Sequence, residues 1–588
     1  MNNSTLTPRQ ALIVRLAVGL VFGLALGWLI KAMTPHYPQH PAQWVQICTS
    51  VLLLGAFIIW AGAGAMRRVT LAVWSAVALA LIAYFAWNRI CHALVFDDNP
   101  FFFNLYFLVY PFLFIAHELV SSGDQTGKGI ASYPLYFDQA WKHGVQLALA
   151  VVFTGLFWGI LMLGALLLGF IGFDWFKKLI ENAYFAFPVS GMALAASVQL
   201  GDIQTKLTQN FRALVLGLLS WLLPVITVIG IIFAVSLCFS GLAPLWDTKA
   251  ATASLLGGCV ALVLLINAAY QQGDEERDIH IVIKWAVRIA CGLLLIFAAL
   301  AAFSLYLRVA QYGLTPERVL AGVGCLIAVS YGIGYPVAAV VTGGRWMRLV
   351  ETVNIAMAFV MVVVFLAVLT PVADPLRLSA DSQAARAASG KIAADAFDWD
   401  VLRYGTGTYG KAHLTDLAKN GKTDAIRKAA AAAALMPDDR RWSVRSERWD
   451  LDDAAMPDGK IAPKAPVKPD PKWIHMVQPG AVVPASFLGQ ANVPESDTSA
   501  CLTGAAKVCY AALIDFNDDG QVEFLLLDDH LLARYVEGSD HAWTLRPNHR
   551  VFLDNTAVAA FKANKLSTRK PEPQWNYLKI GDDVEKMN

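Results

Sequence analysis

Residues 213–238, ALVLGLLSWLLPVITVIGIIFAVSLC, form a continuous apolar run without a charged side chain. About 20 apolar residues in a helix are enough to cross the hydrocarbon core of a bilayer. This run is longer than that, so it predicts a transmembrane helix. The remainder of the chain decides whether the helix stands alone or belongs to a larger membrane domain.

The whole composition has the same character as this run. Of 588 residues, 56% are hydrophobic and only 16% are charged, and the mean hydropathy is +0.49. A soluble domain carries about 25% charged residues. The apolar runs lie near 11–33, 44–65, 69–89, 100–120, 145–172, 182–200, 213–238, 251–270, 283–307, 318–341 and 350–371. We therefore predict a polytopic all-α membrane bundle of about eleven transmembrane helices, with the lipid bilayer as its main partner.

The sixth run, NAYFAFPVSGMALAASVQL, is the least apolar because it contains an Asn, a Pro and two Ser. It predicts a span, with a re-entrant or buried segment as the alternative that would invert everything after it. Lys and Arg favour the cytoplasmic side, and a cytoplasmic N-terminus puts more of them inside. The tail after Pro371 is then periplasmic. The net charge of +2 shows no clustered basic footprint, which excludes nucleic acid as a partner.

The tail differs in amino-acid composition from the membrane region. Its first part, 372–472, contains an Ala-rich stretch that predicts a helix over 411–434, followed by the Pro- and Lys-rich linker PDGKIAPKAPVKPDPK. Its second part, 473–588, contains the β-like runs AVVPASFL, CYAALIDF, QVEFLLLDD and ARYVEG. We predict three regions: a transmembrane domain over 1–371, the helical segment and linker over 372–472, and a small extracytoplasmic α+β domain over 473–588.

Cysteine placement is consistent with this orientation. Six of the eight cysteines lie in or beside the apolar runs, where a thiol behaves as a small apolar group. Cys501 and Cys509 share the tail and enclose a short ring, CLTGAAKVC. We predict a disulfide between them, as expected in an oxidising periplasm. A pair of reduced thiols is the alternative.

The segment DFNDDGQVE has oxygen-bearing side chains at alternate positions, followed by the sharp turn that Gly520 allows. This spacing resembles a calcium loop. Position twelve, which is a bidentate Glu in an EF-hand, is Leu526, so the resemblance is to weak structural loops that join β-strands. An Asx-rich turn without metal is the alternative. The predicted calcium ligands are Asp515, Asn517, Asp519, Gln521 through its backbone carbonyl, and Glu523.

Polar side chains within the apolar runs are functional candidates, because burying them in lipid is costly. For Arg15, Arg288 and Glu351 we expect the side chain to snorkel to the headgroups from near a helix end. The neighbours His117 and Glu118 do not form a zinc-protease motif, because the second His of H-E-x-x-H is Ser121 here. The remaining candidates are the amides Asn104, Asn267 and Asn354.

Two other features bear on function. Pro336 in SYGIGYP predicts a kinked or interrupted span, which a transporter can use to bind its ligand, although close packing is the alternative. The chain lacks the nucleophile elbow, the phosphate loop and the dinucleotide fingerprint. Asp97 and Asp98 lie in an outer loop that could serve an enzyme acting on lipid-linked substrates. The missing motifs favour a protein without a catalytic site.

The segments FDQAWKHGVQLALAVVFTGLFWG, LYLRVAQYGLTPERV and FDWDVLRYGTGTYGKAHL resemble the bacterial membrane proteins of the domain-of-unknown-function 4153 family. The most specific piece is YGLTPERV, from Tyr312 to Val319. The resemblance covers most of the membrane region and the start of the tail. It implies a bacterial inner-membrane location, and it supplies no catalytic residues.

Three functions remain open on this basis. The first is a non-enzymatic envelope role, in which the outer domain binds an envelope protein or a small-molecule ligand. The second is transport of a small solute through the bundle, and the third is an enzyme acting on lipid-linked envelope substrates. Transport predicts paired polar groups that meet at mid-bilayer, an enzyme predicts an outward cavity at Asp97 and Asp98, and the envelope role predicts neither.

Overall fold

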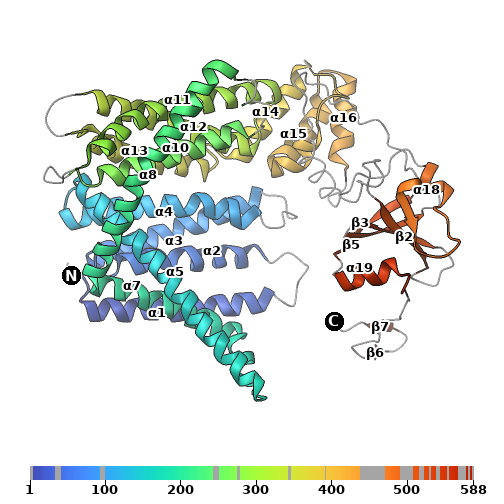
Figure 1. The fold of residues 1–588 in the computed structure, drawn as a ribbon, viewed down its shortest axis with the longest axis horizontal. Helices are drawn as coiled ribbons and strands as arrows, with labels where there is room; N and C mark the ends of the chain where they lie inside the picture. Colours follow the sequence, from blue (N-terminus) through green and yellow to red (C-terminus); the bar gives the residue numbers. More distant parts are fainter. Residues whose placement is uncertain are drawn as a thin grey trace. The chain divides into compact units, whose positions relative to one another are not determined.

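The chain consists of two compact units, Met1–Trp442 and Ser443–Asn588, in a computed structural model (Figure 1). The first unit is built of helices and the second contains a β-sheet. Each unit is described by itself below. The structure describes residues 4–33, 42–92, 100–242, 245, 250–273, 279–341, 346–390, 392–436, 471–489, 508–515, 522–528, 531–537, 543–552, 555–566, 578–580 and 583–585.

Long helices make up most of the first unit. Within the described ranges, ten of them are long and apolar enough to cross a membrane, which confirms the predicted class. The weak sixth run is one of these ten, as helix α7. The ten are α1 (Pro8–Met33), α2 (Gln43–Gly62), α3 (Arg68–His92), α5 (Tyr133–Phe170), α7 (Ala183–Ile203), α8 (Thr205–Ser240), α10 (Ala251–Tyr270), α11 (Ile281–Tyr312), α12 (Pro316–Val340) and α13 (Leu349–Val368). Helix α4 (Pro100–Thr126) coincides with the fourth predicted run.

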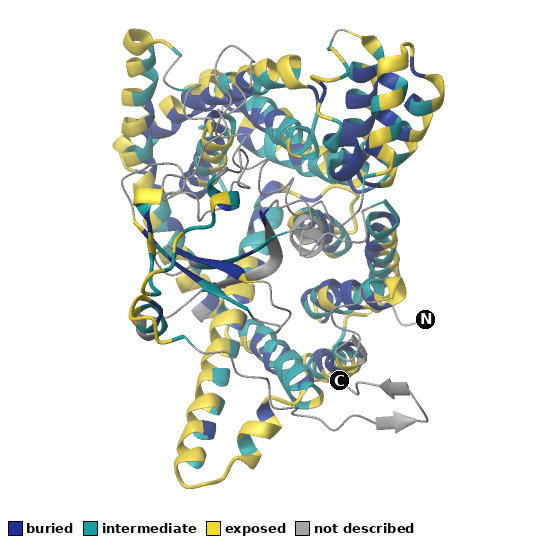
Figure 2. Ribbon diagram, turned by 90° about the vertical axis from the view of Figure 1, so that its right-hand side faces the viewer, coloured by how far each residue is buried: buried dark blue, intermediate teal, exposed yellow. Residues whose placement is uncertain are grey.

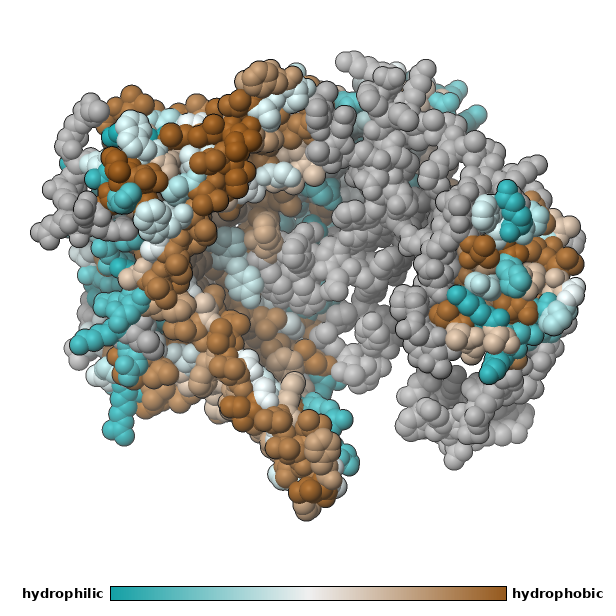
Figure 3. Space-filling view, in the orientation of Figure 1, coloured by the Kyte–Doolittle hydropathy of each residue, from teal (hydrophilic) through white to brown (hydrophobic). Residues whose placement is uncertain are grey.

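The outer surface of these helices is apolar. For α5, Figure 2 shows that much of the helix is exposed and Figure 3 shows that its surface is hydrophobic. On α5, Ile160 is 70% exposed and Phe170 is 75% exposed, and Phe239 on α8 is 86% exposed. Apolar patches this extensive are rare on soluble monomers and are the normal lipid-facing surface of a membrane protein. The exposed apolar side chains therefore place α5 and α8 at the periphery of the helical unit.

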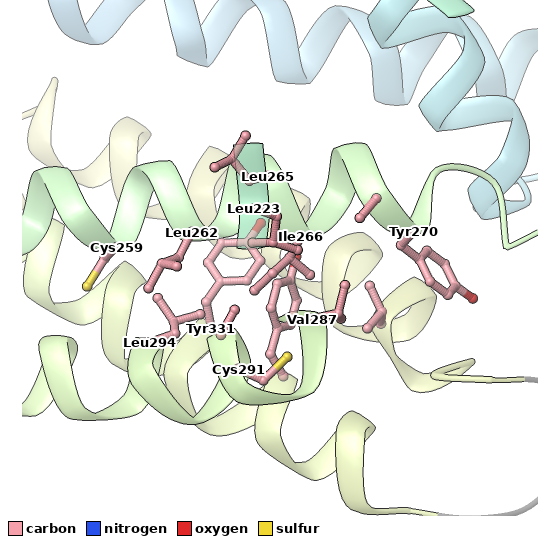
Figure 4. Packing of buried hydrophobic residues seen from close by; sticks show 14 of the residues in the cluster. Leu223, Cys259, Leu262, Leu265, Ile266, Tyr270, Val287, Cys291, Leu294 and Tyr331 are labelled. Carbon is pink, nitrogen blue, oxygen red and sulfur yellow. The ribbon is translucent and has the colours of Figure 1, made fainter. Parts of the chain in front are cut away.

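Two separate hydrophobic cores lie inside the first unit. The smaller one joins α1–α4, with Leu54, Ile82 and Leu113 fully or almost fully buried. The larger one joins the start of α5 with α8 and α10–α13, and Figure 4 shows side chains such as Leu223, Ile266 and Leu294 meeting there. The helical unit thus contains two packed groups of helices, with α5 and α13 contributing to the contact between them.

The closest helix contact in the first unit is between α1 and α7. Gly19, Gly23 and Gly27 are four residues apart, so they share one face of α1. A Cβ added at Gly19 would lie 2.5 Å from the Gly191 carbonyl oxygen, and one at Gly23 would lie 2.3 Å from Pro188 Cα. Glycine is required here because the two backbones touch, as in other small-residue membrane interfaces.

The helical unit continues past the predicted boundary at residue 371. Helix α14 (Pro375–Ser389) binds the end of α11, because Gln383 donates from Nε2 to the carbonyls of Tyr312 and Leu314, both at 2.9 Å. At the start of α15 (Gly407–Asn420), the Tyr409 ring stacks on His92 of α3 at 4.4 Å between centroids. The segment after the last membrane helix is therefore packed on the membrane helices.

The Ala-rich stretch forms two helices, so the single helix predicted over 411–434 is wrong. Helix α15 ends at Asn420 and α16 runs over Asp424–Ala434. Thr423 caps α16 by accepting a hydrogen bond from the Ile426 amide at 3.2 Å. Alanine propensity promotes helix formation, but the sequence NGKT between the two helices favours a turn and a new cap.

The second unit is centred on a five-stranded sheet of order β1-β2-β3-β4-β5. Strand β1 (Ile474–Met476) is parallel to β2 (Cys509–Ile514), and the other pairs are antiparallel: β3 (Glu523–Asp528), β4 (Leu531–Glu537) and β5 (Trp543–Phe552). The predicted strands in CYAALIDF, QVEFLLLDD and ARYVEG are confirmed. A separate pair, β6 (Leu578–Ile580) and β7 (Asp583–Glu585), follows.

Both faces of this sheet are covered, because its side chains alternate in direction. Phe524 and Leu526 pack with Phe487 of α18 (Ala485–Gly489), and Leu525 and Leu527 pack on the side of Phe561, in α19 (Asn555–Lys562). The prediction of a strand in AVVPASFL is wrong, because its second half is α18. Phe487 is needed above the sheet, and a short helix places it there.

We expect Gly23→Ala to destabilise the helical unit by about 1–3 kcal/mol, the usual cost of overpacking. The added methyl group would overlap the backbone of Pro188, which has no rotamer to adjust. Thermal unfolding of the purified chain in detergent measures the effect. The matched control is Gly155→Ala on α5, where a Cβ meets nothing within 4 Å. Equal unfolding temperatures for the two variants would contradict the close contact.

Candidate functional site

Polar side chains from different helices meet at several places in the described part of the helical unit, and three of these clusters include polar residues that the sequence placed within spans. The first cluster is built around Arg15 of α1. Arg15 is 1% exposed and its Nη2 lies 2.6 Å from Asp202 Oδ2 of α7. Its Nη1 donates to Gln199 Oε1 at 2.5 Å. From α5, Lys142 Nζ and Gln146 Nε2 both lie 2.8 Å from Asp202 Oδ1. The cluster therefore ties α1, α5 and α7 together.

The expectation that Arg15 snorkels to the headgroups is wrong. Its remaining donors are bound by α2, since Nε donates to the Trp60 carbonyl at 2.8 Å and Nη2 donates to the Ala63 carbonyl at 2.7 Å. A buried guanidinium is tolerated when its charge is paired and its N–H groups are bonded. Asp202 is far from Arg15 in sequence, so only the folded chain reveals this partner.

The second cluster is a network of amides and hydroxyls in the larger core. Asn354 of α13 donates from Nδ2 to Asn267 Oδ1 of α10 at 2.6 Å, and it accepts from the Tyr335 hydroxyl of α12 at 2.7 Å. Asn267 Nδ2 also lies 2.7 Å from that hydroxyl. Tyr133 of α5 donates to Asn267 Oδ1 at 3.3 Å. Four helices thus share one uncharged polar network.

The third cluster contains His117 and Glu118 of α4, the adjacent polar residues discussed in the sequence analysis. Glu118 Oε1 lies 2.6 Å from His143 Nδ1 of α5. The His117 and His143 rings are 5.6 Å apart in an edge-to-face arrangement, and Trp74 of α3 donates from Nε1 to His117 Nδ1 at 3.2 Å. His117, Glu118 and His143 are 0%, 5% and 3% exposed. Two imidazoles and a carboxyl are therefore enclosed by helices.

This third cluster differs from the first two in its hydrogen bonding. Within the described part of the chain, His117 Nε2, Glu118 Oε2 and the nearby α4 hydroxyl of Ser122 are buried and have no hydrogen-bond partner. In proteins such atoms are uncommon and call for an explanation. In the first two clusters, each polar side-chain atom named above has a hydrogen-bond partner. The third cluster is the candidate functional site for this reason.

The other polar residues in the spans have simpler environments. Arg288 is exposed on α11 and its guanidinium lies 5.4 Å from the centre of the Trp285 ring, while its snorkelling stays a prediction. Glu351 accepts a hydrogen bond from the Tyr270 hydroxyl at 3.0 Å, inside the helical unit. Helix α12 continues through Pro336, so this span is not interrupted, and the alternative of a kink stays a prediction. The side chains of Asn104, Asp97 and Asp98 lie outside the described residues.

The predicted calcium loop joins β2 and β3, as its position between two strand-like runs indicated. Asp515 and Glu523 lie at its two ends, while Asn517, Asp519 and Gln521 fall outside the described residues. Glu523 is 4% exposed and forms an ion pair with Arg534 of β4. This pairing already balances one of the carboxylates that the sequence assigned to calcium.

The predicted disulfide has one described member. Cys509 is the first residue of β2 and is fully buried. Cys501 lies outside the described residues, so the pairing stays a prediction. The six other cysteines are free thiols, as expected for positions in or beside the spans.

Sequence reasoning missed His143, Asp202, Tyr133 and Tyr335, which complete the three clusters. His143 lies in the polar first turns of α5, ahead of the apolar run at 145–172. It was therefore not counted among the polar residues within a span. Tyr is common at helix ends and did not stand out as a hydrogen-bond donor. The detectable signal was the four-residue spacing of glycines in α1, which indicates a close helix partner.

Comparison with known proteins adds no relative. No protein-family model, curated protein or solved structure matches this chain.

We expect Arg15→Met to destabilise the folded chain by about 3–5 kcal/mol, the usual cost of removing one member of a buried ion pair. Met preserves most of the side-chain volume, so the loss reports the charge and the hydrogen bonds. Thermal unfolding in detergent measures it. Arg288→Met is the matched control, because Arg288 is exposed on the helix surface. If both variants unfold at the parent temperature, the Arg15 cluster does not stabilise the fold.

Proposed function

We propose that this chain is an integral membrane protein that moves a small solute across the bilayer through its helical unit. The observation that carries the proposal is that polar side chains from different helices meet inside both apolar cores. Of the three functions left open by the sequence, transport is the one that predicts paired polar groups between helices, and the proposal places these pairs along the solute route. The envelope role alone gives no reason for them.

Physical cost supports the same choice. An ionisable group in a membrane helix is costly, and such groups most often mark transport routes or proton relays. The helical unit contains an Arg–Asp–Lys cluster, a His–Glu–His cluster and an Asn–Tyr network. The network is uncharged and offers both donors and acceptors, which suits a small polar solute that exchanges hydrogen bonds during passage.

For the location, we propose the bacterial inner membrane with eleven spans, α4 included. In this proposal the N-terminus is cytoplasmic and the second unit is periplasmic, where a Cys501–Cys509 disulfide forms readily. The excess of Lys and Arg in the inner loops supports this orientation. Membership in the domain-of-unknown-function 4153 family is part of the same proposal and rests on the YGLTPERV segment.

Transport is testable with the purified full chain in liposomes. We expect a solute-driven current on a solid-supported membrane for at least one member of a panel of amino acids, monosaccharides and monovalent cations. Asn267→Ala should lower this current because it removes the centre of the Asn–Tyr network. Ser254→Ala, at an exposed position of the same helix, should retain it. Currents no larger than those of protein-free liposomes across the panel would reject transport that moves charge with these solutes.

A second candidate function is ligand or partner binding by the second unit in the envelope, with the helical unit as anchor. It is favoured by one observation: the second unit is a compact body with its own sheet and its own apolar cores. We propose that the loop between β2 and β3 binds calcium weakly in this role. The cation would brace the hairpin and would perform no chemistry.

Calcium binding should slow amide hydrogen exchange in the β2–β3 hairpin of the full chain. Half of the effect is expected at around 10⁻⁴ to 10⁻³ M calcium, as in extracellular modules. Mass spectrometry of the peptides that contain Cys509–Ile514 and Glu523–Asp528 measures it. Asp519→Asn should abolish the response, and magnesium at equal concentration is the control. The same exchange in calcium and in chelator would reduce the loop to a turn.

A further inference from the structure

The His117, Glu118 and His143 side chains share a closed position among four helices. His117 and Glu118 come from α4 and His143 from α5, while α3 contributes Trp74. Helix α2 also contacts the cluster, because the Phe57 ring lies 5.8 Å from the His117 ring. The three side chains are at most 5% exposed. Any charge that they gain is therefore held away from water and from the lipid.

Trp74 determines which ring nitrogen of His117 carries the hydrogen. An indole N–H is only a donor, so the nitrogen it contacts must accept. His117 Nδ1 therefore carries no hydrogen, and in the neutral ring the hydrogen is on Nε2. An imidazolium donates from both nitrogens and would lose the Trp74 bond. The geometry thus describes a neutral His117 whose buried Nε2–H has no acceptor among the described residues.

Glu118 and His143 share one proton. Their 2.6 Å separation is a short hydrogen bond of the charge-assisted kind. The same distance leaves no space for a metal ion between the two atoms. The second carboxylate oxygen, Glu118 Oε2, is buried and has no partner in the described part of the chain. It is the acceptor at which a further proton can bind.

Charged side chains on the surrounding helices form ion pairs with one another. Arg15 of α1, Lys142 of α5 and Asp202 of α7 form their own cluster. At the C-terminal end of α4, six residues after Glu118, Asp124 pairs with Arg67 at 2.7 Å. The contacts from α2 and α3 are the uncharged Phe57 and Trp74. A proton is therefore the species that can change the charge of the Glu118–His143 pair.

We propose that Glu118 and His143 form a proton-binding site, with His117 as a neutral hydrogen-bond donor beside it. In this site His143 carries a single hydrogen, on Nδ1, so the pair of carboxylate and neutral imidazole has a charge of −1. Uptake adds one proton at Glu118 Oε2 and changes this charge to 0, while the Nδ1 hydrogen stays in the bond to Oε1. Release removes the same proton, and no other bond is made or broken. Coupling of this proton to solute movement rests on the proposed transport function, whereas proton binding itself does not.

Infrared difference spectroscopy of the purified full chain, titrated from alkaline to acid pH, tests proton binding. We expect a carbonyl band from a protonated, buried carboxyl that is absent in Glu118→Gln and shifted in titration midpoint in His143→Gln. Glu181→Gln, at the exposed position directly after the short helix α6 (Trp175–Ile180), should keep the band. Glu118→Asp, measured if the Gln variant fails to fold, should retain a carboxyl band with an altered midpoint. An unchanged band in Glu118→Gln, or a parent midpoint in Glu118→Asp, would overturn the site.

Coupling is tested separately, in liposomes that contain a pH-sensitive dye. If a solute drives a current in the parent chain, the dye should report proton movement with it, and Glu118→Gln should lose both while Glu181→Gln retains both. Solute current without proton movement would overturn the coupling and leave transport standing. A titrating band without current for any solute would leave the proton site standing and count against transport.

Discussion

The backbone contact between α1 and α7 is the constraint on which the first half of the helical unit depends. Because Gly19 and Gly23 lack side chains, α7 approaches α1 until their backbones touch. That approach brings Gln199 and Asp202 to Arg15. Asp202 in turn holds Lys142 and Gln146 of α5. The next residue after Lys142 is His143, so the same contact helps to position the imidazole that meets Glu118.

The three polar clusters solve the same physical problem in different ways. Lipid cannot hydrogen-bond a polar group, so each group needs a partner from the protein. The Arg15 cluster pairs opposite charges, and the Asn–Tyr network matches donors to acceptors without charge. The His117–Glu118–His143 cluster leaves a donor and an acceptor without partners among the described residues. Bonded clusters rigidify a bundle, whereas an incompletely bonded one can change its protonation at small structural cost.

The second unit is held together by a β-sheet with an apolar core on each face. Its sheet is covered on both faces, by Phe487 on one and Phe561 on the other. The strands alternate between these faces, and the ion pair between Glu523 and Arg534 joins β3 to β4.

The sequence by itself determined the membrane class, the approximate spans and the hairpin around DFNDDGQVE. Apolar run length and strand alternation are local properties, and the structure confirms the helices and strands predicted from them. The sequence also singled out His117, Glu118, Asn267 and Asn354 as polar residues within spans. Charge and hydropathy are properties of single residues, which is why these candidates could be identified without a fold.

Only the tertiary structure decided what those residues contact. Arg15, which we expected to snorkel, pairs with Asp202 of α7, and His117 contacts Trp74 of α3 and His143 of α5. Pairing across distant helices depends on which helices touch and on their rotation about their axes. A hydropathy pattern does not encode that rotation in a lipid-exposed bundle, because any apolar face can point to lipid or to another helix.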